Sequence, residues 1–255
     1  MSPANSVFSQ ALAAIRRRPL TLWFAAAWPY LILALVYVSI AIIIRANQAS
    51  GPQISLLERY AAMGFGEKLA SILAFIVTIF VPADLAASSV CFLIWTEHQG
   101  QESTLGVYFL RLIRVIFPLV VLSVSIGTVT LIASMAAGIP GLLFAAWTAF
   151  VIPTLIIGDA SMTKSFRTGL RRGSENFGKL VPIYLVIAII LALVWFLSIF
   201  VMIQTAEQNW KVSLASFWLI FTIAWSSGMM IRSAFVACLL IRAPFASQPS
   251  PTGQA

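Results

Sequence analysis

The sequence predicts an all-α polytopic membrane protein, with six transmembrane helices and short interfacial amphipathic helices. Three observations lead to this fold class. The 255 residues are 60% hydrophobic and only 9% charged, whereas soluble domains contain roughly a quarter charged residues. Apolar runs of about 18 residues or more recur along the chain, as membrane-spanning helices require. These runs are continuous rather than alternating, which argues against a membrane β-barrel.

Six apolar runs define the expected spans of a single domain, 1–242. The first run is too long for the core of a signal peptide, which is about 7–15 residues, so we expect an uncleaved span. The six spans are 22–44, 69–95, 115–137, 139–157, 181–203 and 212–241. Residues 243–255 are rich in Pro and Ser and are expected to form a disordered cytoplasmic tail.

A short turn is expected between the third and fourth spans. Only Gly138-Ile139-Pro140-Gly141 interrupts this apolar stretch. One helix across both runs would be far longer than a hydrocarbon core of about 30 Å, since each residue rises 1.5 Å. Glycine and proline are the strongest helix breakers, so the four residues predict a tight hairpin.

Basic amphipathic segments precede the first, third and fifth spans. In residues 2–15, Phe8, Leu12 and Ile15 recur at helical spacing, which predicts a short helix lying in the interface; a frayed tail is the alternative. Similar segments are LGVYFLRLIR before the third span and SMTKSFRTGLRRG before the fifth.

The distribution of Lys and Arg predicts that both termini are cytoplasmic. Six spans place the termini on one side, and that side holds twelve Lys and Arg residues, counting Arg232 inside the last span. The other side holds four, Arg45, Arg59, Lys68 and Lys211. Because basic residues collect on the cytoplasmic side of membrane proteins, we expect a multi-pass protein of the bacterial inner membrane.

The basic segments are expected to anchor the protein at the cytoplasmic surface. Each charge attracts anionic lipid headgroups by about 1 kcal/mol near the surface. Ordinary anchoring and a specific headgroup site are both compatible with the pattern. The candidate anchor residues are Arg16, Arg17, Arg18, Lys164, Arg167, Arg171, Arg172 and Lys179.

Residues 138–180 resemble a known family pattern. The Gly-Ile-Pro-Gly turn, Pro153 in the next span, and a helix with Ser165, Leu170, Arg172 and Gly173 are similar to the membrane domain of some glycerophosphoryl diester phosphodiesterases and related six-helix bacterial membrane proteins. Lys164 departs from the small residue usual beside the serine. The phosphodiesterase domain itself is absent, so the resemblance implies a six-helix fold and no hydrolase activity.

Asp84 and Arg232 are the candidate functional residues inside the membrane. Asp84 lies roughly 16 Å from the cytoplasmic end of its span, and Arg232 lies at a similar depth. Charged residues at such depth are rare and are functional candidates. We expect the two to pair or to share a polar cavity. A relay for a proton or substrate and a purely structural pair both fit the sequence.

The remaining polar residues have structural interpretations. Ser and Thr residues inside the spans permit close helix packing, although they are also able to line a cavity. Cys91 and Cys238 are expected to be small buried side chains. Glu97, His98 and Glu102 are expected to form a solvated loop. The sequence contains no catalytic triad, P-loop, dinucleotide or metal motif, so we expect no catalytic residues, no metal and no cofactor.

Two functions from different classes remain open at this point. The first is a non-enzymatic transport or channel role for a small solute or lipid. The second is a membrane-organising or accessory subunit that binds anionic lipids or a partner protein through its basic helices. Membrane lipids are the expected partners, together with a further copy of the chain or a membrane partner protein. Nucleic acid is not expected, because no soluble basic domain presents the net charge of +8.

Overall fold

A computed structural model describes residues 3–48, 63–101, 104–158, 161–206 and 210–242. The described residues contain helices and short turns and no strand. Six stretches are long and apolar enough to cross a membrane: Pro19–Ile40, Phe65–His98, Leu105–Met135, Ile139–Gly158, Met162–Val201 and Ser216–Arg242. The predicted all-α polytopic fold is confirmed. The expected disordered tail at 243–255 lies outside the described residues.

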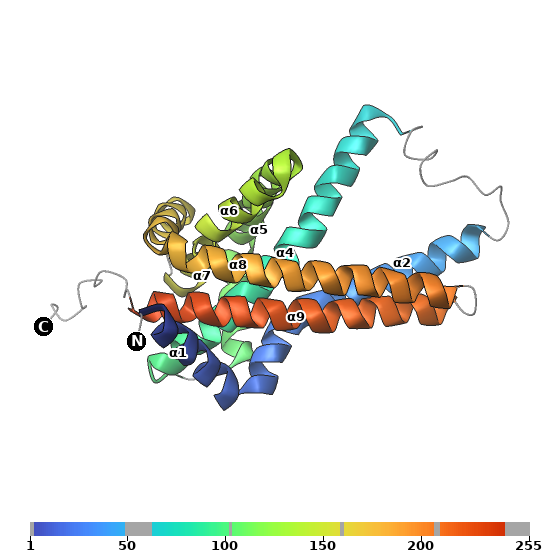
Figure 1. Ribbon diagram of the computed structural model, residues 1–255. Helices are drawn as coiled ribbons and strands as arrows, with labels where there is room; N and C mark the ends of the chain where they lie inside the picture. The colour runs from blue at the N-terminus through green and yellow to red at the C-terminus, as the bar shows by residue number, and fades with distance from the viewer. Residues whose placement is uncertain (1–2, 49–62, 102–103, 159–160, 207–209, 243–255) are drawn as a thin grey trace, which may run out of the picture.

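The described residues form the following helices in chain order. They are α1 (Pro3–Arg17), α2 (Pro19–Gln48), α4 (Phe65–His98), α5 (Leu105–Ala137), α6 (Ile139–Trp147), α7 (Val151–Gly158), α8 (Met162–Ala206) and α9 (Trp210–Arg242). α1 and the last turn of α9 lie at the same end of the bundle (Figure 1), where Arg242 Nε donates to Gln10 Oε1 at 3.1 Å. We call this end the basic end.

The three amphipathic segments behave differently. The first forms a helix of its own, α1, which turns its Val7 and Ala11 into the core and leaves Phe8 about half exposed. The second and third are not separate helices, since they continue without a break into the spans as the first turns of α5 and α8. With 45 residues, α8 would be roughly 67 Å long at 1.5 Å per residue, so much of it extends beyond the hydrocarbon core.

The turn between α5 and α6 depends on two glycines. Gly138 ends α5 with a φ of 75°, a left-handed conformation that favours glycine. A side chain at Gly141 would collide with the Ser134 hydroxyl on α5, so only glycine lets the two helices come this close. Pro140 lies in the first turn of α6, where a missing N–H costs little. The predicted hairpin is therefore present.

The fourth span is two helices, α6 and α7, rather than one. Pro153 has no N–H to donate to the carbonyl of Ala149, so the regular hydrogen-bond ladder is interrupted there. The chain closes a tighter turn instead, with Val151 N donating to Thr148 O at 2.9 Å. α7 then begins with Pro153 in its first turn.

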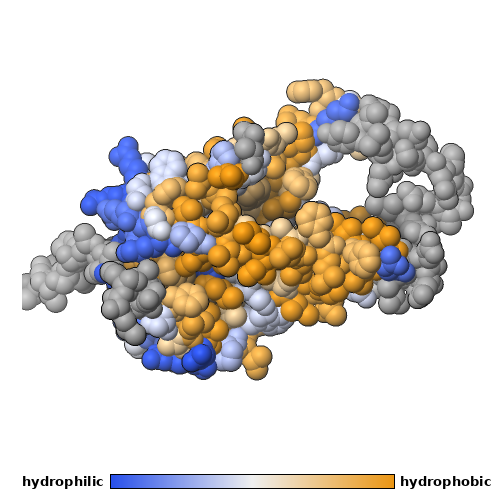
Figure 2. Space-filling view, in the orientation of Figure 1, coloured by the Kyte–Doolittle hydropathy of each residue, from blue (hydrophilic) through white to orange (hydrophobic). Residues whose placement is uncertain are grey.

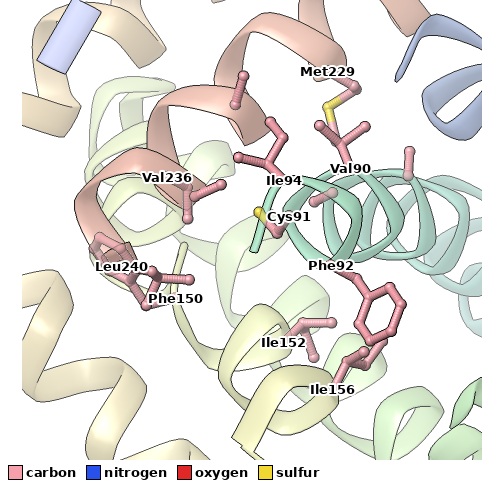
Figure 3. Close-up of a cluster of buried hydrophobic side chains, with 14 of the residues drawn as sticks. Val90, Cys91, Phe92, Ile94, Phe150, Ile152, Ile156, Met229, Val236 and Leu240 are labelled. Carbon is pink, nitrogen blue, oxygen red and sulfur yellow. The ribbon is translucent and has the colours of Figure 1, made fainter. Parts of the chain in front are cut away.

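The core lies around the second half of α4. Every residue from Ala86 to Ile94 is buried, and α4 contacts α2, α5, α7 and α9. Cys91 and Ile94 point toward α9, whereas Phe92 points toward Ile156 of α7 (Figure 3). Cys91 and Cys238 are both buried in this core, as the sequence predicts.

Small residues of α4 hydrogen-bond directly to neighbouring helices. Ser89 Oγ donates to the Ala25 carbonyl of α2 at 2.6 Å, and Cys91 Sγ donates to the Ser233 carbonyl of α9 at 3.2 Å. Such bonds require that the helix backbones approach closely, which small side chains permit.

In the other half, α4 separates from its neighbours while α2, α8 and α9 stay together, as the ring contacts Tyr37–Trp218 and Trp195–Phe217 show. Beyond the core, the first turns of α4 point away from α2, α8 and α9 (Figure 1). Residues 65–75 of α4 are almost all exposed in the isolated chain, and no residue of 31–40 in α2 is buried. We use the name open half for four segments: 65–75 of α4, 31–40 of α2, 185–201 of α8 and 216–231 of α9. Its surface is mainly apolar, whereas hydrophilic residues gather at the basic end (Figure 2).

Two glycines bring α8 against α6 and α7. Gly169 and Gly173 are four residues apart and both are buried. A Cβ at Gly169 would lie 2.5 Å from the Val151 Cα, and one at Gly173 would collide with the Trp147 carbonyl. This is the small-xxx-small arrangement that lets membrane helices cross closely.

We expect Gly173→Ala to destabilise the protein. The added methyl group forces α8 away from α6, and overpacking of this kind costs about 1–3 kcal/mol. The measurement is the melting temperature of the purified protein in detergent. Gly178→Ala is the matched control, because Gly178 is on the same helix and a Cβ added there would have no neighbour within 4 Å, and alanine favours helix. Equal melting temperatures for the two variants would contradict the close contact.

Candidate functional site

Asp84 and Arg232 lie at the border between the core and the open half. In α4, Asp84 comes just before the buried run that starts at Ala86; in α9, Arg232 comes just before the buried run Ser233–Leu240. Both residues are partly exposed in the isolated chain. At 1.5 Å per residue, Asp84 is roughly 21 Å from the end of α4 and Arg232 roughly 15 Å from the end of α9. Both charges are therefore deep in the membrane and beside the open half.

The border between the core and the open half also runs through α2 and α8. Tyr30 is 2% exposed and ends the buried part of α2, and Tyr184 is 5% exposed on α8. Both tyrosines interact electrostatically with Asp84 and Arg232. Five helices thus bring polar side chains to one level. We call the group the boundary cluster, which consists of Tyr30, Asp84, Ser123, Tyr184, Trp225 and Arg232.

Arg232 is held mainly by an aromatic ring. Its Cζ lies 4.9 Å from the centroid of the Tyr184 ring, a cation–π contact. Arg232 and Asp84 interact electrostatically, yet no ion pair joins them. The two residues therefore share a polar site without a direct salt bridge.

Several polar atoms of the boundary cluster are buried without a partner in good hydrogen-bond geometry. They are Tyr30 Oη, Ser123 Oγ, Tyr184 Oη, Trp225 Nε1 and Arg232 Nε. A buried polar atom without a partner costs about 1–3 kcal/mol, and such atoms are normally satisfied by protein or by ordered water. Buried polar atoms of this kind also occur elsewhere in the described residues, for example at Thr154 and Thr222. The cluster is distinguished because it places them beside two charged side chains, which makes it the candidate binding site.

Two of these atoms have a polar neighbour within the cluster. Ser123 lies beside the Asp84 carboxylate, and Trp225 lies beside Tyr30. Neither pair reaches the geometry of a formed hydrogen bond. The polar groups of the cluster are therefore close to one another without hydrogen bonds of good geometry.

Most other hydroxyls inside the spans serve packing. Ser125, Thr128 and Thr130 donate to the carbonyl four residues earlier in α5, and Ser227 does the same in α9. Ser88 exchanges a hydrogen bond of 2.9 Å with Tyr108. The hydroxyls of the boundary cluster differ from these because none of them is tied to a backbone carbonyl.

The basic anchor residues are separate from the boundary cluster. Arg16, Arg17 and Arg18 are exposed at the junction of α1 and α2, and Arg18 Nε lies 3.9 Å from the Glu97 carboxylate. Glu102, which the sequence groups with Glu97, lies outside the described residues.

The anchors on α8 are exposed with one exception. Lys164, Arg167, Arg171 and Lys179 are on the surface, whereas Arg172 is buried with only 8% exposure. Arg171 Nε donates to Glu175 at 2.9 Å. Arg172 is therefore part of the packing around α8 rather than a freely accessible headgroup ligand.

Sequence reasoning missed three members of the cluster. Tyr30, Tyr184 and Trp225 are aromatic residues of the kind that collects at membrane interfaces, and such a belt is the simpler interpretation of Tyr30. Depth along the spans does not group them, because Tyr184 is three residues from the start of span 181–203, whereas Asp84 is eleven residues from the end of span 69–95.

Comparison with family models, with curated proteins and with solved structures found no match. The resemblance of residues 138–180 to a phosphodiesterase membrane domain therefore stays a prediction. Chemically, the boundary cluster offers one cation, one carboxylate and several hydrogen-bond donors in an apolar surrounding. Such a set suits binding of a polar group within the membrane.

We expect a cysteine at position 84 to react with a small methanethiosulfonate reagent in detergent. The native Cys91 and Cys238 are buried, 0% and 5% exposed, so the wild type should react only after denaturation. Ala86→Cys is the matched control, since Ala86 is nearby on α4 and fully buried. If Asp84→Cys is as unreactive as Ala86→Cys, Asp84 is not accessible from the open half.

Proposed function

We propose that this integral membrane protein has a non-enzymatic transport or channel role for a small solute or lipid. The observation that carries the proposal is the boundary cluster, in which Asp84 and Arg232 are partly exposed deep in the membrane. Buried charges inside membranes commonly mark substrate or ion pathways. A purely structural pair would be expected to form a direct salt bridge, whereas no ion pair joins these two side chains.

The division into a core and an open half supports the same proposal. A transporter needs a site that is accessible from one side while the other side is closed. Here the core between Asp84 and the basic end is tightly packed, and the open half begins at the level of the two charges. An arrangement closed at one end and open at the other agrees with one state of an alternating-access cycle.

We further propose a location in the bacterial inner membrane with both termini in the cytoplasm. The support is the excess of Lys and Arg on the N-terminal side of the spans. The exposed basic residues of α1 and of the first turns of α8 agree with this orientation, since both segments lie toward the basic end (Figure 2).

An accessory role is the second candidate. It is favoured by the exposed basic residues Lys164, Arg167 and Arg171 along the first turns of α8. A basic helix at the surface of a membrane attracts anionic lipids or an acidic partner protein. A second copy of the chain is a further candidate partner for this role.

The family resemblance is kept as a proposal about the fold. The residues that carry it contribute to packing: Gly141 faces Ser134, and Gly173 faces the backbone of Trp147. The pattern therefore describes how α5, α6 and α8 fit together.

We expect Asp84→Asn to abolish or strongly reduce flux in liposomes made with purified protein. The variant keeps the size of the side chain and removes its charge. Glu67→Gln is the control, because Glu67 is an exposed carboxylate near the start of the same helix. Wild-type protein without flux across a broad panel of solutes and lipids would count against transport and favour the accessory role.

We expect a C-terminal green fluorescent protein fusion to fluoresce in a bacterial host, and a C-terminal alkaline phosphatase fusion to be inactive. Fluorescent protein folds in the cytoplasm, whereas alkaline phosphatase needs the oxidising periplasm for its disulfides. The reverse pattern would place the termini outside and overturn the proposed orientation.

A further inference from the structure

The open half carries no charge between the boundary cluster and its far end. Residues 69–83 of α4, 185–206 of α8 and 212–231 of α9 contain no Asp, Glu, Lys or Arg. A small hydrophilic ion would have to cross this apolar stretch without compensation. A molecule with an apolar chain would instead be solvated by it.

The boundary cluster at the closed end of this stretch is rich in donors. Trp225 Nε1 and Arg232 Nε donate hydrogen bonds and accept none, and neither has a partner in hydrogen-bond geometry. The hydroxyls of Tyr30 and Tyr184 are also able to donate. Arg232 adds a positive charge whose guanidinium matches the geometry of carboxylate and phosphate. The complement of this set is an anionic group with several acceptor oxygens.

Aromatic rings extend from the cluster along α9 into the open half. Trp225 stacks on Phe221 with centroids 5.2 Å apart, and Phe221 stacks on Phe217 at 6.2 Å. Trp225 also meets Tyr30 edge-on at 6.4 Å. The donor groups of the cluster are thus continuous with an apolar surface.

We infer that the boundary cluster binds an anionic amphiphile, with its phosphate or carboxylate head on Arg232 and its acyl chain along the open half. This inference rests on the proposed function and names the substrate class for the same site. Asp84 partly neutralises the charge of Arg232 while the site is empty. When the ligand binds, its anionic head neutralises that charge instead.

Equilibrium binding to the purified full-length protein tests this inference. The probe is radiolabelled oleoyl lysophosphatidic acid, and the protein is held in zwitterionic phosphatidylcholine nanodiscs. We expect saturable binding that oleate displaces, because it has a chain and an anionic head. Monoolein, which has the chain without the charge, and inorganic phosphate, which has the charge without the chain, should displace little.

We expect Arg232→Gln to weaken this binding about tenfold or more, because a charge-assisted hydrogen bond is lost. Arg114→Gln is the matched control, since Arg114 is an exposed arginine on α5 outside the cluster. If Arg232→Gln does not fold, Tyr30→Phe should still weaken binding and Tyr37→Phe should not, because only Tyr30 belongs to the cluster.

Three outcomes would overturn the inference: equal displacement by monoolein, equal displacement by inorganic phosphate, or unchanged affinity in Arg232→Gln. Binding and flux are separate measurements. Specific binding without flux would remove the transport proposal and leave the binding site. Flux of other solutes without binding of the probe would remove the inference and leave the transport proposal.

Discussion

Close packing of small residues in α4 is the constraint on which the structure depends. In a bilayer, lipid tails are as apolar as leucine, so helices associate through close contact and hydrogen bonds rather than through a hydrophobic driving force. Ala86, Ala87, Ser88 and Ser89 leave room for the neighbouring backbones, and Ser89 bonds directly to the α2 carbonyl at Ala25. This region holds α2, α5, α7 and α9 together.

The open half follows from the end of that small-residue run. Before Asp84, α4 carries bulky side chains such as Leu73, Phe75 and Val77, which are exposed in the isolated chain. Bulky residues do not allow the same close approach, and the first turns of α4 diverge from α2, α8 and α9 (Figure 1). The start of the small-residue run at Ala86 thus coincides with the level at which α4 joins its neighbours.

The position of the boundary cluster agrees with the energetic cost of placing charged side chains elsewhere in the membrane. A charge in the packed core would be desolvated without compensation, and one on the lipid-facing surface would be surrounded by hydrocarbon. At the border, Asp84 and Arg232 remain partly accessible and near one another. The hydroxyls of Tyr30 and Tyr184 stay without formed hydrogen bonds in the same place, which is the physical basis for expecting a ligand there.

The sequence by itself determined the class of fold, the number of spans and the turn at Gly138. It also identified Asp84 and Arg232 as charged residues inside the spans. Each follows from local composition: long apolar runs, helix breakers, and ionisable residues in an apolar context. The break before Pro153 also follows from a local feature, the missing proline N–H, although it was not predicted. The burial of Arg172 depended on contacts between helices.

Only the tertiary structure decided which polar residues meet. Tyr30, Asp84, Ser123, Tyr184 and Arg232 come from five helices and share no sequence motif, because their common level is set by how each helix packs on α4 or its neighbours. Sequence spacing gives the depth of a residue along its own helix. It does not give the direction of its side chain or the partner it faces, which packing alone determines.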